Sequence, residues 1–235
     1  MKDTCKIMAN QKRIESCRAV GERERKFGHE RERFFLRQFN QSETVSKHKS
    51  YKAEADTTFD PAHPVFRILV EILNVVGNCV SNKGGSSIQL VLGRLEEIKI
   101  SQEIVDKLNG DIGFVRNLFE KYLAKSMSDK PAHILAYLHG PRKSWIMFNM
   151  GAVVDFLCEK CRWRLTPSGR SIKGDIEDHS KKGQRQYVTI EFRKGKGMFL
   201  GFNGNKGKQF IELLMHPEFG IPHHIEEVKV SEAKI

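Results

Sequence analysis

The chain has 235 residues, and 39% of them are hydrophobic, which is enough to bury a core in one large domain or two small ones. Its 40 lysines and arginines outnumber its 29 aspartates and glutamates, which leaves a formal net charge of +11 at pH 7. This charge favours a polyanionic partner such as nucleic acid, although a merely soluble basic surface has the same composition. No P-loop or Rossmann fingerprint is present, which disfavours nucleotide hydrolases and dehydrogenases.

No apolar stretch approaches the roughly 20 residues that span a bilayer, and the start of the sequence lacks the apolar core of a secretory signal. We therefore expect an intracellular protein with no membrane partner. The 5 cysteines are irregularly spaced, which disfavours a disulfide framework. Cys158 and Cys161 have the spacing of a zinc knuckle, but four ligands are needed and no second such pair follows. The alternative is two thiols at the end of a buried helix.

The first periodic segment contains Phe27, Phe34 and Phe35, which recur at i, i+7 and i+8. This spacing predicts an amphipathic helix over residues 26–38. Residues 1–25 are expected to be disordered or loosely packed. Glu30 lies near the edge of the apolar face, where an i,i+3 pair with Arg33 is its simplest structural role.

The next stretch alternates polar loops with apolar runs. Residues 40–52 are polar and predict a loop, which is a kind of segment that can touch DNA. The run Val65–Leu73 is so apolar that periodicity does not distinguish a buried strand from a helix. Gly77 and Asn78 indicate a turn, so a strand is expected over Cys79–Lys83. The two glycines that follow let the backbone approach a ligand closely.

Helices and strands are both predicted in the rest of the chain. Ser101 is a helix N-cap for residues 103–108, and residues 114–125 have the pattern of a second amphipathic helix. Residues 132–138 and 145–158 supply apolar material. Val188, Ile190 and Phe192 alternate with polar residues, which predicts a half-buried strand.

Asp56 and Lys83 suggest a hydrolytic site. A hard cation held by an aspartate, with a lysine one strand away that orients or deprotonates a water, is a minimal set of groups for cleaving a phosphodiester. Short motifs recur by chance, so these residues are equally compatible with an unrelated strand, turn and strand.

The stretch from Tyr51 to Asp56, followed by Cys79–Gln89, resembles the core of type II restriction endonucleases of the PD-(D/E)xK superfamily. Residues 79–89 look like the variant in which S-x-K and a Gly/Ser-rich segment ending in Gln replace E-x-K. The basic, glycine-rich segments 193–197 and 202–208 are similar to late strands of the same group.

The resemblance implies an α/β fold with a restriction-endonuclease-like mixed central sheet flanked by helices. The whole chain, 1–235, would be a single endonuclease domain, with a catalytic core at 26–100 and a basic DNA-contacting part at 160–217. It further implies Mg²⁺ as the cofactor, double-stranded DNA as the partner and the cytoplasm of a prokaryotic cell as the location. A homodimer is the simplest way to cut both strands of a palindrome.

The resemblance also assigns the catalytic residues. Asp56 and Glu30 would bind the metal, Lys83 would act on the attacking water, and Ser81 stands where the superfamily usually has Glu or Asp. A hydroxyl is the weaker ligand, so either Glu30 or Glu54 supplies the missing charge or the site has lost activity. The motif can also be aligned so that residues 80–83 match a segment just downstream of the catalytic strand. In that alignment the position of the catalytic lysine falls on Asn78, which leaves the site without a base.

Arginine and asparagine read guanine and adenine in the major groove, whereas lysine mostly meets phosphate. Any single candidate is also explained as a solvated surface group. The candidate DNA contacts are Lys52, Asn82, Arg164, Arg170, Lys173, Arg193, Lys194, Lys196, Asn203, Asn205 and Lys206.

The leading hypothesis is therefore a magnesium-dependent, site-specific DNA endonuclease that restricts foreign DNA. The alternative is a nucleic-acid-binding protein related to such enzymes that has no catalytic activity. A third possibility, an RNA-binding or ribosome-associated protein, explains the charge equally well but leaves the arrangement of Asp56 and Lys83 as a coincidence.

Overall fold

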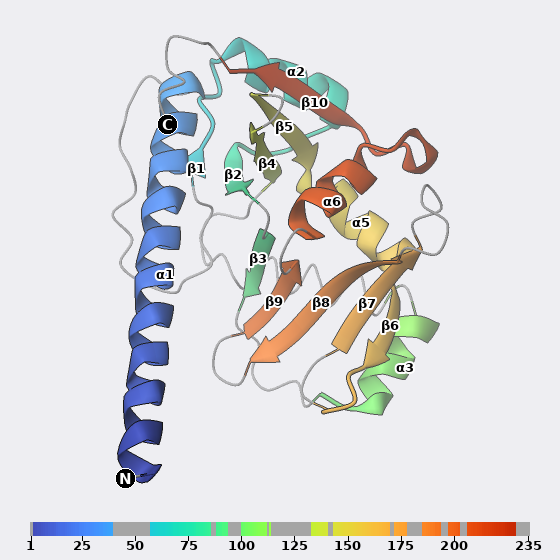
Figure 1. The fold of residues 1–235 in the computed structure, drawn as a ribbon. Helices are drawn as coiled ribbons and strands as arrows, with labels where there is room; N and C mark the ends of the chain where they lie inside the picture. Colours follow the sequence, from blue (N-terminus) through green and yellow to red (C-terminus); the bar gives the residue numbers. More distant parts are fainter. Residues whose placement is uncertain are drawn as a thin grey trace.

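The structure is a computed structural model (Figure 1). It describes residues 2–39, 57–85, 88–93, 100–111, 113, 133–140, 143–169, 172–177, 185–193, 197–202 and 206–228.

Two five-stranded sheets form the centre of the fold. The first sheet has the strand order β1-β2-β4-β5-β10 and is mixed, because β2 and β4 run parallel while the other neighbours run antiparallel. Its strands are β1 (Thr57–Thr58), β2 (Cys79–Gly84), β4 (Ile134–His139), β5 (Ser144–Asn149) and β10 (His223–Glu227).

The second sheet has the order β3-β9-β8-β7-β6 and is antiparallel throughout. Its strands are β3 (Ile88–Gly93), β6 (Arg162–Leu165), β7 (Ile172–Glu177), β8 (Arg185–Arg193) and β9 (Gly197–Phe202). The strand predicted from the alternation at residues 188–192 is confirmed as part of β8.

Helices flank the first sheet, which confirms the expected class of a mixed α/β fold with a flanked mixed sheet. The second sheet was not predicted. The described helices are α1 (Lys2–Phe39), α2 (Pro64–Leu73), α3 (Gln102–Gly110), α5 (Met150–Lys160) and α6 (Lys206–Leu214), with a 3-10 turn η2 (Pro217–Phe219).

The two faces of the first sheet bury separate apolar clusters, because side chains alternate along each strand. On one face Ile134 and Ala136 of β4 pack with residues from α1 and α2. On the other face Leu135 and Tyr137 pack with residues from α3, α5, α6, β6 and β7. The first sheet is therefore the middle layer of the molecule (Figure 1).

Among the residues of helix α1 whose side chains are described, those that pack against the sheet lie in its C-terminal turns. Phe34, Phe35 and Phe39 are buried there, and Phe35 meets the ring of Trp145 edge-on at 5.0 Å. The helix begins at Lys2, so it covers the segment for which disorder or loose packing was expected. Its 38 residues span about 57 Å, and its N-terminal part extends past the sheets (Figure 1).

Capping residues explain why the apolar run Val65–Leu73, whose periodicity fits a strand or a helix, forms a helix. The apolar run after residue 64 forms the helix α2, because the His63 side chain accepts a hydrogen bond from the backbone N–H of Val65 and Pro64 fits the first turn. Asn74 ends the helix with a φ of 51°. The predicted cap Ser101 likewise accepts a hydrogen bond from the N–H of Ile104 at the start of α3.

Candidate active site at the end of strand β2

Strand β2 presents Ser81 and Lys83 on the same face of the first sheet. Their parallel partners on β4 are Leu135 and Tyr137, which belong to the cluster beneath α5 and α6. Asn82 lies between them and its side chain takes the opposite direction. The predicted strand over residues 79–83 thus exists, and it places the two motif residues side by side.

Asn82 is 1% exposed, and its Nδ2 donates a hydrogen bond of 2.7 Å to the hydroxyl of Thr57. Thr57 pairs with Val80, so this bond ties the two-residue strand β1 to the middle of β2. The candidate DNA contact Asn82 is therefore engaged in a buried bond between strands. Asp56, the candidate metal ligand that precedes Thr57 in the chain, lies outside the described residues.

Two side chains from distant segments bind the carbonyls at the end of β2. Arg31 of α1 donates from Nη1 to the Gly84 oxygen at 3.4 Å, and Tyr137 of β4 donates from Oη to the Gly85 oxygen at 2.6 Å. A Cβ on Gly84 would lie 3.0 Å from Cδ of Arg31, so this approach needs a small residue. Gly85 has a φ of 81°, a conformation that glycine adopts without strain.

Side chains from α1, β4 and α6 determine the electrostatics at this strand end. Burial and the carboxylate of Glu212 on α6 raise the pKa of Tyr137, while Arg31 lowers it to a lesser extent. Tyr137 therefore stays protonated at neutral pH and remains a hydrogen-bond donor. Glu212 also pairs with Lys208 of the same helix at 3.7 Å. Sequence reasoning missed Arg31, Tyr137 and Glu212, because only the fold brings them together.

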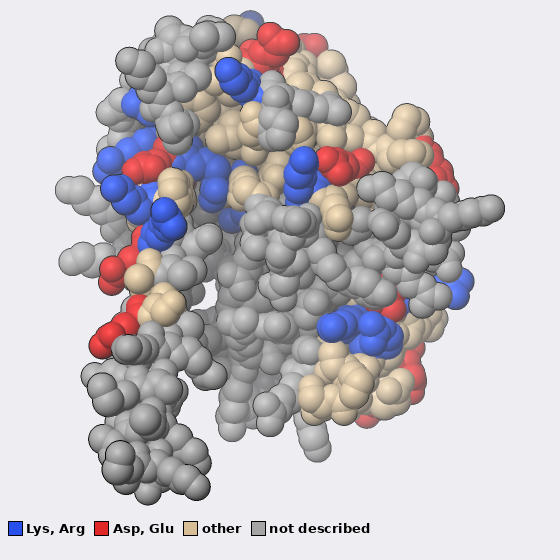
Figure 2. Space-filling view, in the orientation of Figure 1, with Lys and Arg blue, Asp and Glu red and all other residues tan. Residues whose placement is uncertain are grey.

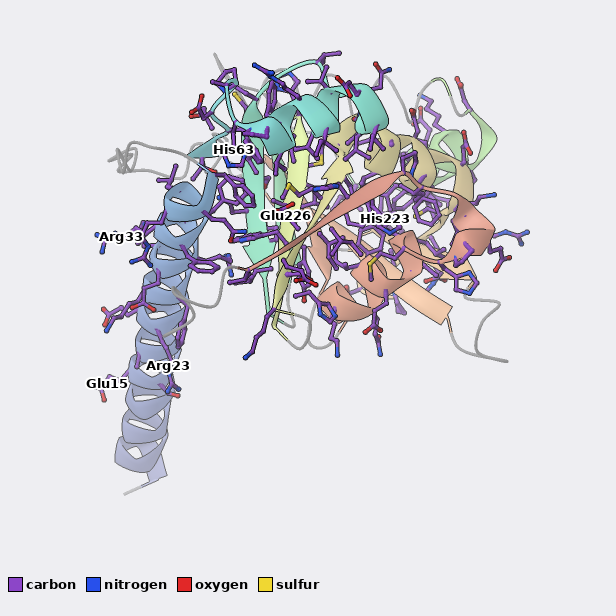
Figure 3. All side chains as sticks on the ribbon, turned by 90° about the horizontal axis from the view of Figure 1, so that it is seen from above. Glu15, Arg23, Arg33, His63, His223 and Glu226 are labelled. Atoms are coloured by element: carbon purple, nitrogen blue, oxygen red, sulfur yellow. The ribbon has the colours of Figure 1, made fainter. Side chains whose placement is uncertain are left out.

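Glu30 lies next to Arg31 on α1 and is half-buried. Helix α1 packs on the face of the first sheet that carries Val80, which is the face opposite to that of Ser81 and Lys83. In Figure 3 the labelled Arg33 points away from the body of the protein. The structure thus groups Ser81 with Lys83, while Glu30 lies on a helix that packs against the other face of the sheet.

No three His, Cys, Asp or Glu side chains come together as a metal site within the described part of the chain. Cys158 and Cys161 are both buried, at the end of α5. Burial, followed by the neighbouring Cys158 and Asp175, raises the pKa of the Cys161 thiol. The pair matches the interpretation of two buried thiols at a helix end.

Three of the basic candidates, Arg164, Lys173 and Arg193, lie on strands of the second sheet. Arg164 of β6 donates from Nε to Asp175 at 2.7 Å, and its strand partner on β7 is Lys173. Arg193 ends β8 and Lys206 begins α6, and their side chains are not described. The other candidates lie outside the described residues: Lys52, Arg170, Lys194, Lys196, Asn203 and Asn205.

Helix α1 adds basic groups that were not among the candidates. Figure 2 shows lysine and arginine side chains gathered over the C-terminal half of this helix. The exposed ones are Arg23, Lys26, Arg33 and Arg37.

Comparison with known proteins finds no matching family model, no matching curated protein and no matching solved structure. None of the described helices is long and apolar enough to cross a membrane. What is established is a mixed α/β protein in which a flanked mixed sheet adjoins an antiparallel one.

Proposed function

We propose that this protein is a magnesium-dependent endonuclease that cleaves double-stranded DNA at a specific sequence. One observation carries the proposal: β2 presents Ser81 and Lys83 on one face, beside the strand β1 that begins directly after Asp56. The net charge of +11 supports a nucleic-acid substrate.

In this proposal Asp56 binds the metal and Lys83 orients or deprotonates the attacking water. A carboxylate and the Ser81 hydroxyl are oxygen donors, which suit a hard cation, so the residues fit magnesium. When bound, the ion would stabilise charge on the phosphate and activate water. Tyr137 and Arg31 act as positioning residues, because each binds a carbonyl within two residues of Lys83.

The test is incubation of the purified chain with plasmid DNA, with Mg²⁺ or with a chelator, followed by mapping of the ends. Lys83→Ala and Asp56→Ala should each lower the cleavage rate by about 100-fold or more, the usual contribution of a group that transfers a proton or holds a catalytic metal. Lys107→Ala is the matched control, because Lys107 is exposed on α3 and its ammonium pairs with Glu103 of the same helix at 2.9 Å. Wild-type rates in both site variants would refute the assignment.

Ser81 favours a second function, a DNA-binding protein without catalysis. A hydroxyl where related enzymes place a carboxylate weakens metal binding. Such a protein retains DNA in Mg²⁺ and produces no fragments. Fluorescence anisotropy at several salt concentrations, with Ca²⁺ in place of Mg²⁺, measures binding in either case.

The same titration tests whether the segment after β8 contacts DNA. Neutralising Arg193, Lys194 and Lys196 together should flatten the dependence of binding on salt by about 0.9 in the log-log slope for each lost phosphate contact. Lys83→Ala should leave that slope unchanged. An unaltered slope in the triple variant would instead favour the basic surface of α1.

A further inference from the structure

Strand β10 is the last strand of the first sheet, and among the described residues it pairs with β5 alone. Its centre, Ile225, is an exposed aliphatic side chain with 42% of its surface accessible. An edge strand offers a row of unpaired backbone groups to another strand. Figure 3 labels His223 and Glu226 along this strand.

The ladder with β5 fixes which backbone groups of β10 face outward. The N–H of Val228 donates to the Lys143 oxygen at 2.8 Å, and the strand register continues this alignment by pairing Glu226 with Trp145. In an antiparallel ladder every second residue bonds to its partner strand. The N–H and C=O groups of His223, Ile225 and Glu227 therefore point away from β5. The Glu227 oxygen accepts a bond from Gln38 Nε2 at 3.1 Å, which agrees with this direction. Pairing with a second copy would exchange this side-chain bond for one from the backbone N–H of His223 of that copy, whereas the groups of Ile225 need no such exchange.

The sequence of β10, His-His-Ile-Glu-Glu, is complementary to itself when reversed. An antiparallel pair of two such strands centred on Ile225 sets His224 opposite Glu226 of the second copy. It also sets His223 opposite Glu227 of the second copy. Side chains on directly opposite residues interact, and hydrogen-bonding or opposite-charge pairs stabilise the ladder.

The outward backbone groups fit this register. Ile225 would exchange both of its backbone bonds with Ile225 of the second copy. His224 and Glu226 would then form the non-hydrogen-bonded pairs, in which Cα atoms lie about 4.5 Å apart and side chains are closest. Within one chain His224 Nε2 already lies 3.2 Å from Glu226 Oε2, so the two side chains are on one face of the strand. Charged side chains on an edge strand usually oppose association with another strand. In this antiparallel register, however, each histidine of one copy lies opposite a glutamate of the other, so the two side chains form a donor–acceptor pair.

We propose that two copies of this chain associate through their β10 edges, in antiparallel register about Ile225, to form one continuous sheet. The inference does not rest on the endonuclease proposal, because it needs neither metal nor DNA. A symmetric dimer joins the two copies through the same surface patch. A single pair of five-residue strands is a small interface, so a dissociation constant on the order of 10–100 µM is expected.

Sedimentation equilibrium of the full chain, without DNA, measures the association. Ile225→Pro should leave the protein monomeric at 200 µM, with its melting temperature nearly unchanged, because the N–H that it removes points away from β5. Ile225→Val is the matched control and should keep the dissociation constant within about threefold, since it preserves the backbone and an aliphatic side chain.

A charge exchange tests the register. His224→Glu alone sets Glu opposite Glu, and Glu226→His alone sets His opposite His, so each variant by itself should be at least tenfold weaker in self-association. An equimolar mixture of the two restores both cross-strand pairs and should recover dimers. Loss of the contact between residues 224 and 226 within each chain does not explain such recovery, because it affects the variants equally in the mixture and alone.

Three results would overturn the proposal. The first is a wild-type protein that is monomeric at 200 µM. The second is a dimer that survives Ile225→Pro, which would place the interface on another surface. The third is a mixture of the exchange variants that associates no better than either variant alone.

Discussion

The side chain of Asn82 in β2 is joined to the side chain of Thr57 in β1 by a buried hydrogen bond of 2.7 Å. Strand β1 has two residues, so this bond adds a substantial part of what holds it in place. The hydrogen bond therefore links β1, which directly follows Asp56 in the chain, to β2, which carries Ser81 and Lys83.

Asn82→Ala and Thr57→Val should each lower the free energy of unfolding by about 1–3 kcal/mol, because each leaves a buried polar group without its partner. The double variant should lose less than the sum of the two, with a coupling of roughly 1 kcal/mol in a double-mutant cycle. Urea denaturation of the four proteins measures it. Strict additivity would show that the bond contributes nothing to stability.

Phe35→Ala should destabilise the protein by about 3–5 kcal/mol, since the ring is fully buried against Trp145 and Phe59. The matched control is Phe27→Ala on the same helix, because that ring is 52% exposed and its loss should cost at most about 0.5 kcal/mol. Thermal and urea unfolding compare them. Equal losses would mean that α1 is not anchored through its C-terminal turns.

Gly174→Ala should destabilise the protein by about 1–3 kcal/mol, because the added Cβ would lie 2.5 Å from the ring of the buried Trp163. The displaced indole should also change the tryptophan fluorescence spectrum. At Gly140 a Cβ would meet nothing within 4 Å, so Gly140→Ala is the control and should be nearly neutral. A neutral Gly174→Ala would show that β6 and β7 separate easily.

Stability should fall as the pH drops below about 6.5, in part through His133. Burial lowers the pKa of this histidine below its ordinary value, so the unfolded chain binds the proton more readily than the folded one does. Its stabilising effect is complete above the pKa of the unfolded state and is lost as the pH falls towards the folded pKa. His133→Gln should therefore lose less stability than the wild type between pH 7.5 and pH 5.5. Parallel losses in urea titrations at the two pH values would contradict this.

Elements with a local signal were predictable from the sequence. The cap at Ser101 and the alternation over Val188–Phe192 depend on residues close together in the chain, and both predictions are confirmed. Residues 2–25 carry few apolar side chains, so no period marked this part of α1, although the chain forms a helix there. The division into two sheets was not predictable, because β2 and β3 are separated by three residues and their different partners lie far along the sequence.

Part of the candidate site was predictable for a similar reason. Alternation along a strand is enough to place Ser81 and Lys83 on one face. The contact of Tyr137 with Gly85 joins residues 52 positions apart, and that of Arg31 with Gly84 joins residues 53 apart. Such pairs depend on how helices and strands pack, so the pattern of neighbouring residues in the sequence does not predict them.

The position of β10 at the edge of the first sheet has a consequence for synthesis of the protein. Strand β5, which contains the apolar run Trp145–Phe148, needs β10 to cover its outer side, and β10 begins only at His223. A nascent chain that emerges from its N-terminus therefore holds β5 as an exposed apolar edge while the 73 residues between Asn149 and His223 are added. Such edges pair with other chains. The yield of folded protein should thus depend on how quickly the last strand leaves the ribosome and on whether a chaperone shields β5 until it does.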